Sequence, residues 1–151
     1  MLCICPSLGR RTLAASAAVV SDGSISLLES VCNRVTVNET ICHRHGDDES
    51  HNVAVPPEAV AYAHSTEEVQ AVVRICSEAN IPLIPFGTGT SLEGHIQALH
   101  GGISLDLSEM NEVLEVNEED LDCRVQAGVT RLGLNDWIRH TGEAVFSRRL
   151  W

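Results

Sequence analysis

Apolar and polar residues in the middle of the chain follow two different periods, which predict an alternation of strands and helices. Residues 59–64 are almost continuously apolar, as in a short buried strand. Apolar side chains then recur on one helical face, at Val69, Val72, Val73, Cys76 and Ala79. This spacing predicts an amphipathic helix directly after the strand.

Local signals mark both ends of this helix. Ser65 and Glu68 form a capping box, in which each side chain accepts a backbone N–H at the start of the helix. Asn80 suits the left-handed residue after the last turn, and Pro82 prevents the helix from continuing. Residues 81–84 then form a second short strand. Two strands joined through a helix lie parallel, so these elements predict a βαβ unit.

Three further strands and a helix are predicted downstream. Apolar and polar residues alternate in 103–107 and in 121–125, and residues 113–116 form another strand-like segment. Because the links between these three strands are short, we expect an antiparallel meander. Thr130 suits an N-cap, and Gly142 follows the last turn of the helix that begins there. The apolar face of this helix consists of Leu134, Trp137 and Ile138.

The two ends of the chain are less regular. Residues 21–37 have a loose helical pattern, and residues 143–146 begin another strand-like segment. Together the elements predict an α+β fold. The 151 residues allow one domain at most, since domains usually have ~100–200 residues.

A glycine-rich loop follows the second strand. Pro85 is expected to end that strand, because proline has no N–H to donate to the ladder. Glycines let a backbone turn sharply and approach a ligand, and successive N–H groups in such a turn form an anion-binding hollow. The loop contains Gly87, Gly89 and Gly94 together with the hydroxyls of Thr88, Thr90 and Ser91. Its spacing is neither a Walker loop nor the Rossmann fingerprint. It favours a diphosphate-binding loop, and the alternative is a glycine-rich connection without a ligand.

The residues from Pro85 to Gly94 resemble the pyrophosphate loop of FAD-linked D-lactate dehydrogenases, in the superfamily of vanillyl-alcohol oxidase and p-cresol methylhydroxylase (PCMH). The resemblance covers roughly residues 43–146 in collinear order. Its other segments are 45–50, 65–69, 80–82, 100–103, 128–131 and 139–142.

This resemblance implies the N-terminal part of a PCMH-type FAD-binding domain: a βαβ unit, a small antiparallel meander and a helix. Residues 56–146 would be its first half, and residues 22–55 a lead-in segment. The expected cofactor-binding residues are Pro85, Phe86, Gly87, Thr88, Gly89, Thr90, Ser91 and Gly94. Thr90 stands where covalently flavinylated relatives have a histidine, so the FAD is expected to be non-covalent.

The resemblance also implies an oxidoreductase that acts on small 2-hydroxy acids, with D-lactate as the expected substrate and cytochrome c or a quinone as electron acceptor. It ends at Phe146, and residues 147–151 diverge. The family's catalytic and metal-binding residues lie beyond that point, so no catalytic residue is assigned here. We therefore expect the 151 residues to be inactive alone. The alternative is a truncated fragment or interaction piece that binds no flavin.

Charge and composition argue against some classes of binding partner. The net charge of −11 argues against nucleic acid or an anionic membrane surface as a partner. No apolar run approaches the ~20 residues that a membrane-spanning helix needs. Residues 1–21 are poor in acidic residues and contain Arg10, Arg11 and several serines, which is typical of a mitochondrial transit peptide. A weak secretory signal or an unstructured tail are the alternatives.

The cysteines and histidines do not form a recognisable centre. The six cysteines lack the spacing of a disulfide scaffold, and Cys76 and Cys123 are expected in the core. The cluster of Cys42, His43, His45 and His51 matches no standard zinc pattern, so no metal site is expected. We expect this cluster to belong to a polar lead-in.

Overall fold

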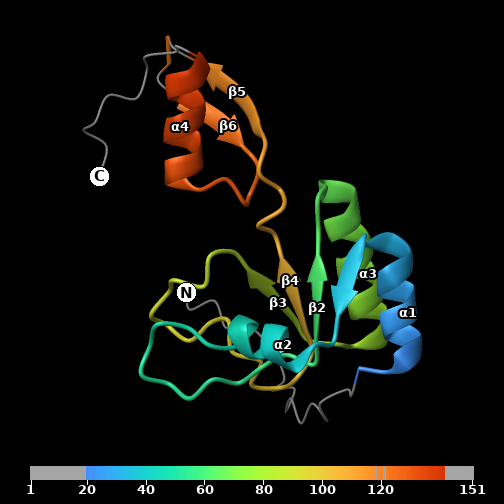
Figure 1. The fold of residues 1–151 in the computed structure, drawn as a ribbon. Coiled ribbons are helices and arrows are strands. Elements are labelled where there is room, and N and C mark those ends of the chain that lie inside the picture. The colour runs from blue at the N-terminus through green and yellow to red at the C-terminus, as the bar shows by residue number, and fades with distance from the viewer. Residues whose placement is uncertain (1–19, 118, 121, 142–151) are drawn as a thin grey trace, which may run out of the picture.

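The computed structural model of the chain describes residues 20–117, 119–120 and 122–141. In chain order the elements are α1 (Asp22–Val31), β1 (Arg34–Thr36), α2 (Glu39–His45), β2 (Ala59–Tyr62), α3 (Thr66–Ala79), β3 (Leu83–Phe86), β4 (Ile103–Asp106), β5 (Val113–Asn117), β6 (Asp122–Val125) and α4 (Arg131–Thr141) (Figure 1). None of the helices within these residues is long and apolar enough to cross a membrane.

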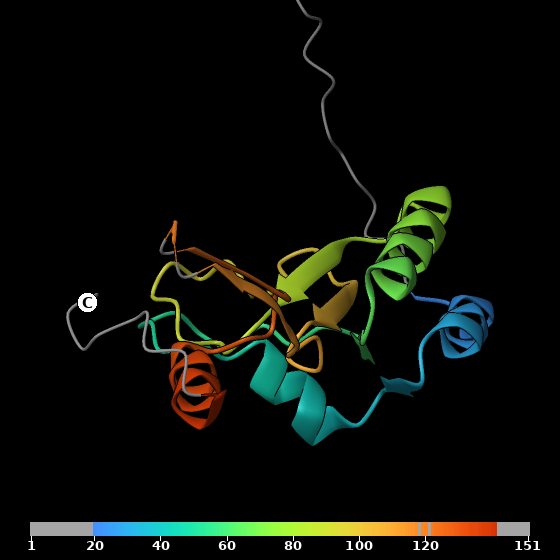
Figure 2. The ribbon, with the colours of Figure 1, turned by 90° about the horizontal axis from the view of Figure 1, so that it is seen from above.

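A four-stranded sheet in the order β1-β2-β4-β3 forms the centre of the fold. Strands β2, β4 and β3 are parallel, and β1 pairs antiparallel with β2. Helices α1 and α3 cover one face, where Leu28 and Val72 pack against Ala61 and Ile103. Helix α2 covers the other face, where Cys42 packs against Val60 and Tyr62. Figure 2 shows these helices around the sheet from above.

The signals at the ends of α3 are confirmed. The Ser65 hydroxyl accepts the Glu68 N–H at 3.2 Å, and the Glu68 carboxylate accepts the N–H of His64 rather than that of Ser65. Asn80 is left-handed, with φ 54° and ψ 37°, and its N–H meets the carbonyls of Cys76 and Ser77. Local chemistry therefore fixes this helix to within a residue at both ends.

Two details of the predicted strand arrangement are wrong. Pro85 does not end β3: it lies within the strand, in register with Leu105. Because β3 is an edge strand, the N–H that proline lacks is not needed for a second neighbour. The strand over 103–107 does not join a three-stranded meander either. It lies between β2 and β3 as β4, parallel to both.

Only β5 and β6 form the expected antiparallel pair, in a sheet of their own. The chain turns at Ser108–Asn111 and leaves the central sheet. The Gly128 N–H then returns to the Met110 carbonyl at 2.8 Å. A Cβ at Gly128 would collide with the Leu107 carbonyl oxygen, so this close contact requires glycine. The short link between β4 and β5 therefore connects two different sheets.

The lead-in segment contains more structure than its sequence indicated. Helix α1 fits the loose pattern over 21–37, but β1 and α2 were not predicted. Helix α2 begins at Asn38, whose side chain accepts the Thr40 and Ile41 N–H groups. Gly46 then lets the chain lie against Val55, because a Cβ at position 46 would collide with the Val55 carbonyl. The predictions for 1–19, Gly142 and 143–146 lie outside the described residues.

Candidate functional site

The loop after β3 presents unpaired backbone N–H groups at the carboxyl end of the parallel strands. Within the described part of the chain, the N–H groups from Gly87 to Ser91 have no hydrogen-bond acceptor. The internal bonds of this loop are few. The Thr88 and Thr90 hydroxyls lie 3.1 Å apart, and the Ser91 hydroxyl accepts the Glu93 N–H. These amides are therefore available to an external anion.

Gly87 and Gly89 differ in whether the protein itself requires a glycine at that position. Gly89 has φ +70°, and a Cβ there would lie 3.0 Å from Cζ of Phe86. Its backbone therefore rests on the Phe86 ring. Gly87 has an ordinary φ, and a Cβ there would meet nothing within 4 Å. The protein itself does not require a glycine at position 87, so the open space beside it is free for a ligand.

Two hollows meet at the loop. One, of about 650 Å³, lies between Gly87 and Thr88 on one side and residues 128–131 and Trp137 on the other. The second, of about 440 Å³, lies between Gly87–Gly89 and the end of α2, where Arg44 and His45 line it. Gly87, Thr88 and Ser108 line both hollows. The first half of the loop is therefore a ridge that a ligand could contact from either side.

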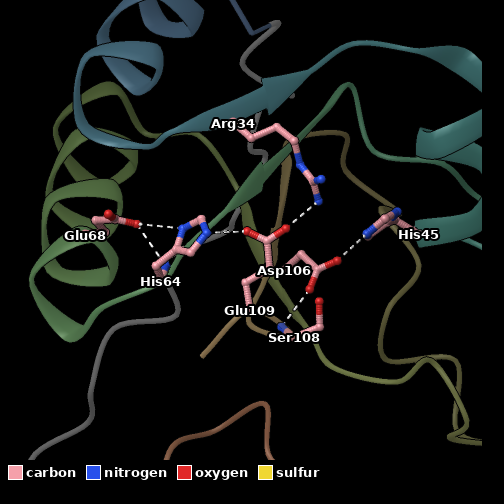
Figure 3. A network of polar contacts seen from close by, with 7 residues as sticks. All are labelled: Arg34, His45, His64, Glu68, Asp106, Ser108 and Glu109. Carbon is pink, nitrogen blue, oxygen red and sulfur yellow. Dashed lines mark hydrogen bonds and ion pairs between the residues drawn. The ribbon is translucent and has the colours of Figure 1, made fainter. Parts of the chain in front are cut away.

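A buried ion pair lies beneath this ridge (Figure 3). His45 and Asp106 are 7% and 5% exposed, and Nε2 of His45 lies 3.0 Å from Oδ2 of Asp106. The other carboxylate oxygen of Asp106 accepts the Ser108 N–H at 2.8 Å. Burial alone would raise the pKa of Asp106, but the hydrogen bonds from His45 and Ser108 outweigh it and lower that pKa below its usual value. Asp106 is therefore a carboxylate that accepts from both neighbours.

A second network in Figure 3 ties the turn after β4 to the sheet and to α3. Glu109 lies 2.8 Å from Arg34 and 2.7 Å from His64, and His64 in turn lies 3.7 Å from Glu68. The Arg34 guanidinium stacks 3.4 Å from the centre of the Tyr62 ring. Apart from Tyr62, which lines the smaller hollow, these side chains line neither hollow at the loop, so we assign this network a structural role.

The far end of the loop rests on the lead-in segment. Gly94 has φ +71°, and a Cβ there would lie 2.9 Å from Nδ2 of Asn52. The Asp48 carboxylate accepts the Ser50 N–H at 3.1 Å, and hydrogen bonding from Ser50 is the main cause that lowers the pKa of Asp48. The lead-in thus touches the loop at both of its ends, through His45 and through Asn52.

The predicted site residues do not all lie together. Phe86, Gly87, Thr88 and Gly89 line the hollows, with Phe86 and Gly89 only in the smaller one. The others line neither hollow at the loop: Pro85, Thr90, Ser91 and Gly94. No group of three or more His, Cys, Asp or Glu side chains in the described residues is placed to hold a metal ion. Cys76 is buried as predicted, whereas Cys123 is only half-buried.

The sequence alone does not reveal the floor of the site. In the sequence, His45 belongs to a cluster of cysteine and histidines in a polar lead-in, and Asp106 is a polar position in an alternating strand. A usable signal was the position of Asp106 at the carboxyl end of its strand, because ligands bind at that end of parallel sheets. Nothing in the sequence linked it to His45, which is 61 residues away.

The sequence matches a family described as an FAD binding domain, over residues 57–146. The chain is 43% identical over 141 residues to the probable mitochondrial D-lactate dehydrogenase of Danio rerio, covering 92% of this chain and 28% of that relative. It is 43% identical over 89 residues to the mitochondrial D-lactate dehydrogenase [cytochrome] of Kluyveromyces lactis, covering 57% of this chain and 16% of that relative. The chain therefore spans less than a third of either relative's length.

A solved structure has the same arrangement of elements. p-Cresol methylhydroxylase with substrate bound superposes with a TM-score of 0.71 at 25% sequence identity. The superposition covers 80% of this chain and 24% of that one.

Proposed function

The chain belongs to the FAD binding domain family, with the mixed α+β fold of p-cresol methylhydroxylase, and on that premise we propose that the amides from Gly87 to Ser91 bind the diphosphate of FAD. The observation that carries this proposal is the row of N–H groups without acceptors at the carboxyl end of β3. Such groups recognise phosphate oxygens locally, so the net charge of −11 does not oppose binding. Pro85, Phe86 and Gly94 would hold the two ends of this loop in place.

The larger hollow suits the extended part of a dinucleotide cofactor. It runs from Gly87 and Thr88 to the start of α4, where residues 128–131 face the loop. Thr88, Thr90 and Ser91 would add hydroxyl donors. Thr90 cannot form a histidyl–flavin bond, so the FAD would be held without a covalent link.

The activities for which the relatives are named point to the reaction class of the whole protein. We propose an oxidoreductase that acts on D-2-hydroxy acids, D-lactate in particular, in mitochondria. FAD, when bound, supplies a hydride acceptor, and the protein orients it and sets its electrostatic surroundings. Cytochrome c or a quinone would take the electrons. Residues 1–151 would contribute cofactor binding and no catalytic side chain.

A pair of glycine substitutions tests the diphosphate site. Gly87→Ala adds a methyl group that meets nothing in the protein, so the thermal midpoint should stay unchanged. Because that methyl points into space beside the ridge, FAD affinity should fall by about tenfold, the equivalent of one hydrogen bond to a charged group. Affinity is measured by calorimetric or NMR titration with FAD.

Gly23→Ala is the matched control. Gly23 lies in α1, far along the chain from the loop, and a Cβ there would come no closer than 3.8 Å to the Ser21 hydroxyl. FAD affinity should be that of the wild type. The proposal fails if the wild-type chain binds no FAD, or if Gly87→Ala and Gly23→Ala bind it equally well.

A further inference from the structure

His45 faces two hydrogen-bond acceptors. Its Nδ1 lies 2.8 Å from the Ile41 carbonyl oxygen, one turn back in α2, and its Nε2 lies 3.0 Å from the Asp106 carboxylate. A carbonyl oxygen only accepts, and an ionised carboxylate only accepts. Each ring nitrogen thus faces an acceptor, and the two contacts fix the ring in a single orientation.

The fixed ring supports the start of the loop. The His45 and Phe86 rings have centroids 4.2 Å apart with an angle of 41° between their planes, and Tyr62 meets His45 edge-on at 6.0 Å. Phe86 is the last residue of β3, directly before the first unpaired amide of the loop. The Phe86 ring also meets the backbone of Gly89, where a Cβ would lie only 3.0 Å from Cζ of Phe86.

These contacts connect the His45 ring, the Phe86 ring and the Gly89 backbone in series. Asp106 connects this series to a second part of the site, because it also accepts the Ser108 N–H, and Ser108 lines both hollows. A displacement of His45 would let Phe86 turn, and the amides on either side of Gly89 would then point elsewhere.

We propose that His45, held by Asp106, is a positioning residue for FAD: through Phe86 it fixes the direction in which the loop amides point. The inference rests on the proposed function of the loop. It also assigns a role to the lead-in segment, because His45 lies outside residues 57–146 that match the family. A buried, hydrogen-bonded pair beside the Tyr62 and Phe86 rings is suited to this role, since its contacts hold the His45 ring in one arrangement.

Three variants of the full chain test the inference, each with FAD affinity and thermal midpoint measured. His45→Gln removes the ring and should weaken FAD binding by about tenfold, as expected for one misdirected hydrogen bond to the diphosphate. His43→Gln changes an exposed residue of the same helix and should leave the affinity unchanged. The double variant His45→Phe/Asp106→Asn keeps a ring against Phe86 and leaves no unpaired buried carboxylate, so it should bind FAD within about threefold of the wild type.

A purely structural role predicts a different pattern. In that case His45→Gln would lower the thermal midpoint and, below that midpoint, bind FAD like the wild type, which would overturn the inference. Equal losses in His45→Gln and the double variant would overturn the role of the ring. Absence of FAD binding by the wild type would reject the proposed function and this inference with it.

A measurement on the wild type covers the case in which His45→Gln does not fold. The NMR signals of the His45 and Phe86 side chains should shift on addition of FAD, while those of His43 should not. His45 and Phe86 signals that stay in place while the Gly87 and Gly89 amides shift would overturn the inference.

Discussion

Asp106, the last residue of β4, is 5% exposed. The ionised form of its carboxylate depends on two hydrogen-bond donors. Because these donors lower the pKa of Asp106 in the folded chain, its ionisation stabilises the fold above the ordinary aspartate pKa of about 3.9. That contribution is lost as the pH falls through the lowered value. The residue thus links the acid stability of the fold to the floor of the cofactor site.

Asp106→Asn should reveal this link. At pH 7 the substitution should reduce the free energy of unfolding by about 1.5–3 kcal/mol, the typical contribution of hydrogen bonds to a charged group. The difference from the wild type should shrink as the pH falls below about 4, because the wild-type carboxylate becomes protonated first in the unfolded chain and, at lower pH, in the folded chain as well. Denaturant unfolding at several pH values between 7 and 3 measures both effects.

Asp136→Asn provides the control. Asp136 pairs with Arg139 on the surface of α4 and is 64% exposed. Its loss should cost less than about 1 kcal/mol, as is typical of exposed pairs. A constant difference between Asp106→Asn and the wild type across the pH range would contradict the assignment of Asp106 as the acid-sensitive carboxylate.

At the scale of elements, α3 depends on its first hydrogen bond. Ser65→Ala removes the hydroxyl that accepts the Glu68 N–H and should lower the free energy of unfolding by about 1 kcal/mol. Ser77→Ala, at an exposed position within the same helix, should be neutral or slightly stabilising, because alanine is the better helix former. Chemical denaturation of both variants measures the contrast, and equal effects would contradict the capping role.

What the sequence predicted well was local. The cap at Ser65, the left-handed Asn80 and the glycine loop each depend on neighbours a few residues away, so their chemistry is visible in the sequence. The position of β4 between β2 and β3 was missed because a short link to β5 suggested pairing. Pro85 was misread because its tolerance depends on β3 being an edge strand, which only the complete sheet determines.

The candidate site likewise has a local part that the sequence predicts and a long-range part that it does not. The loop amides could be predicted because glycines and hydroxyls mark them. The pair of His45 and Asp106 could not, since in the sequence His45 looks like part of a polar lead-in and Asp106 like a polar position in a strand. Their contact follows from the packing of α2 against the sheet face opposite α1 and α3.

At the scale of the whole molecule, we expect this chain to bind the cofactor without catalysing turnover. The chain spans 28% of the Danio rerio relative, and the loop contacts that we propose are to the diphosphate alone. We therefore expect the 151 residues to bind FAD more weakly than micromolar and to show no reduction of a dye with D-lactate and added FAD. Measurable D-lactate-dependent reduction would contradict this division of roles.

Amide hydrogen exchange tests the central claim most directly, because the loop N–H groups themselves are observed. Without cofactor, the amides from Gly87 to Ser91 should exchange rapidly, since they have no acceptor among the described residues. With FAD at a saturating concentration they should become protected, while the amides of α1 exchange as before. Loop amides that are already protected without FAD, or that exchange equally fast with it, would contradict the account.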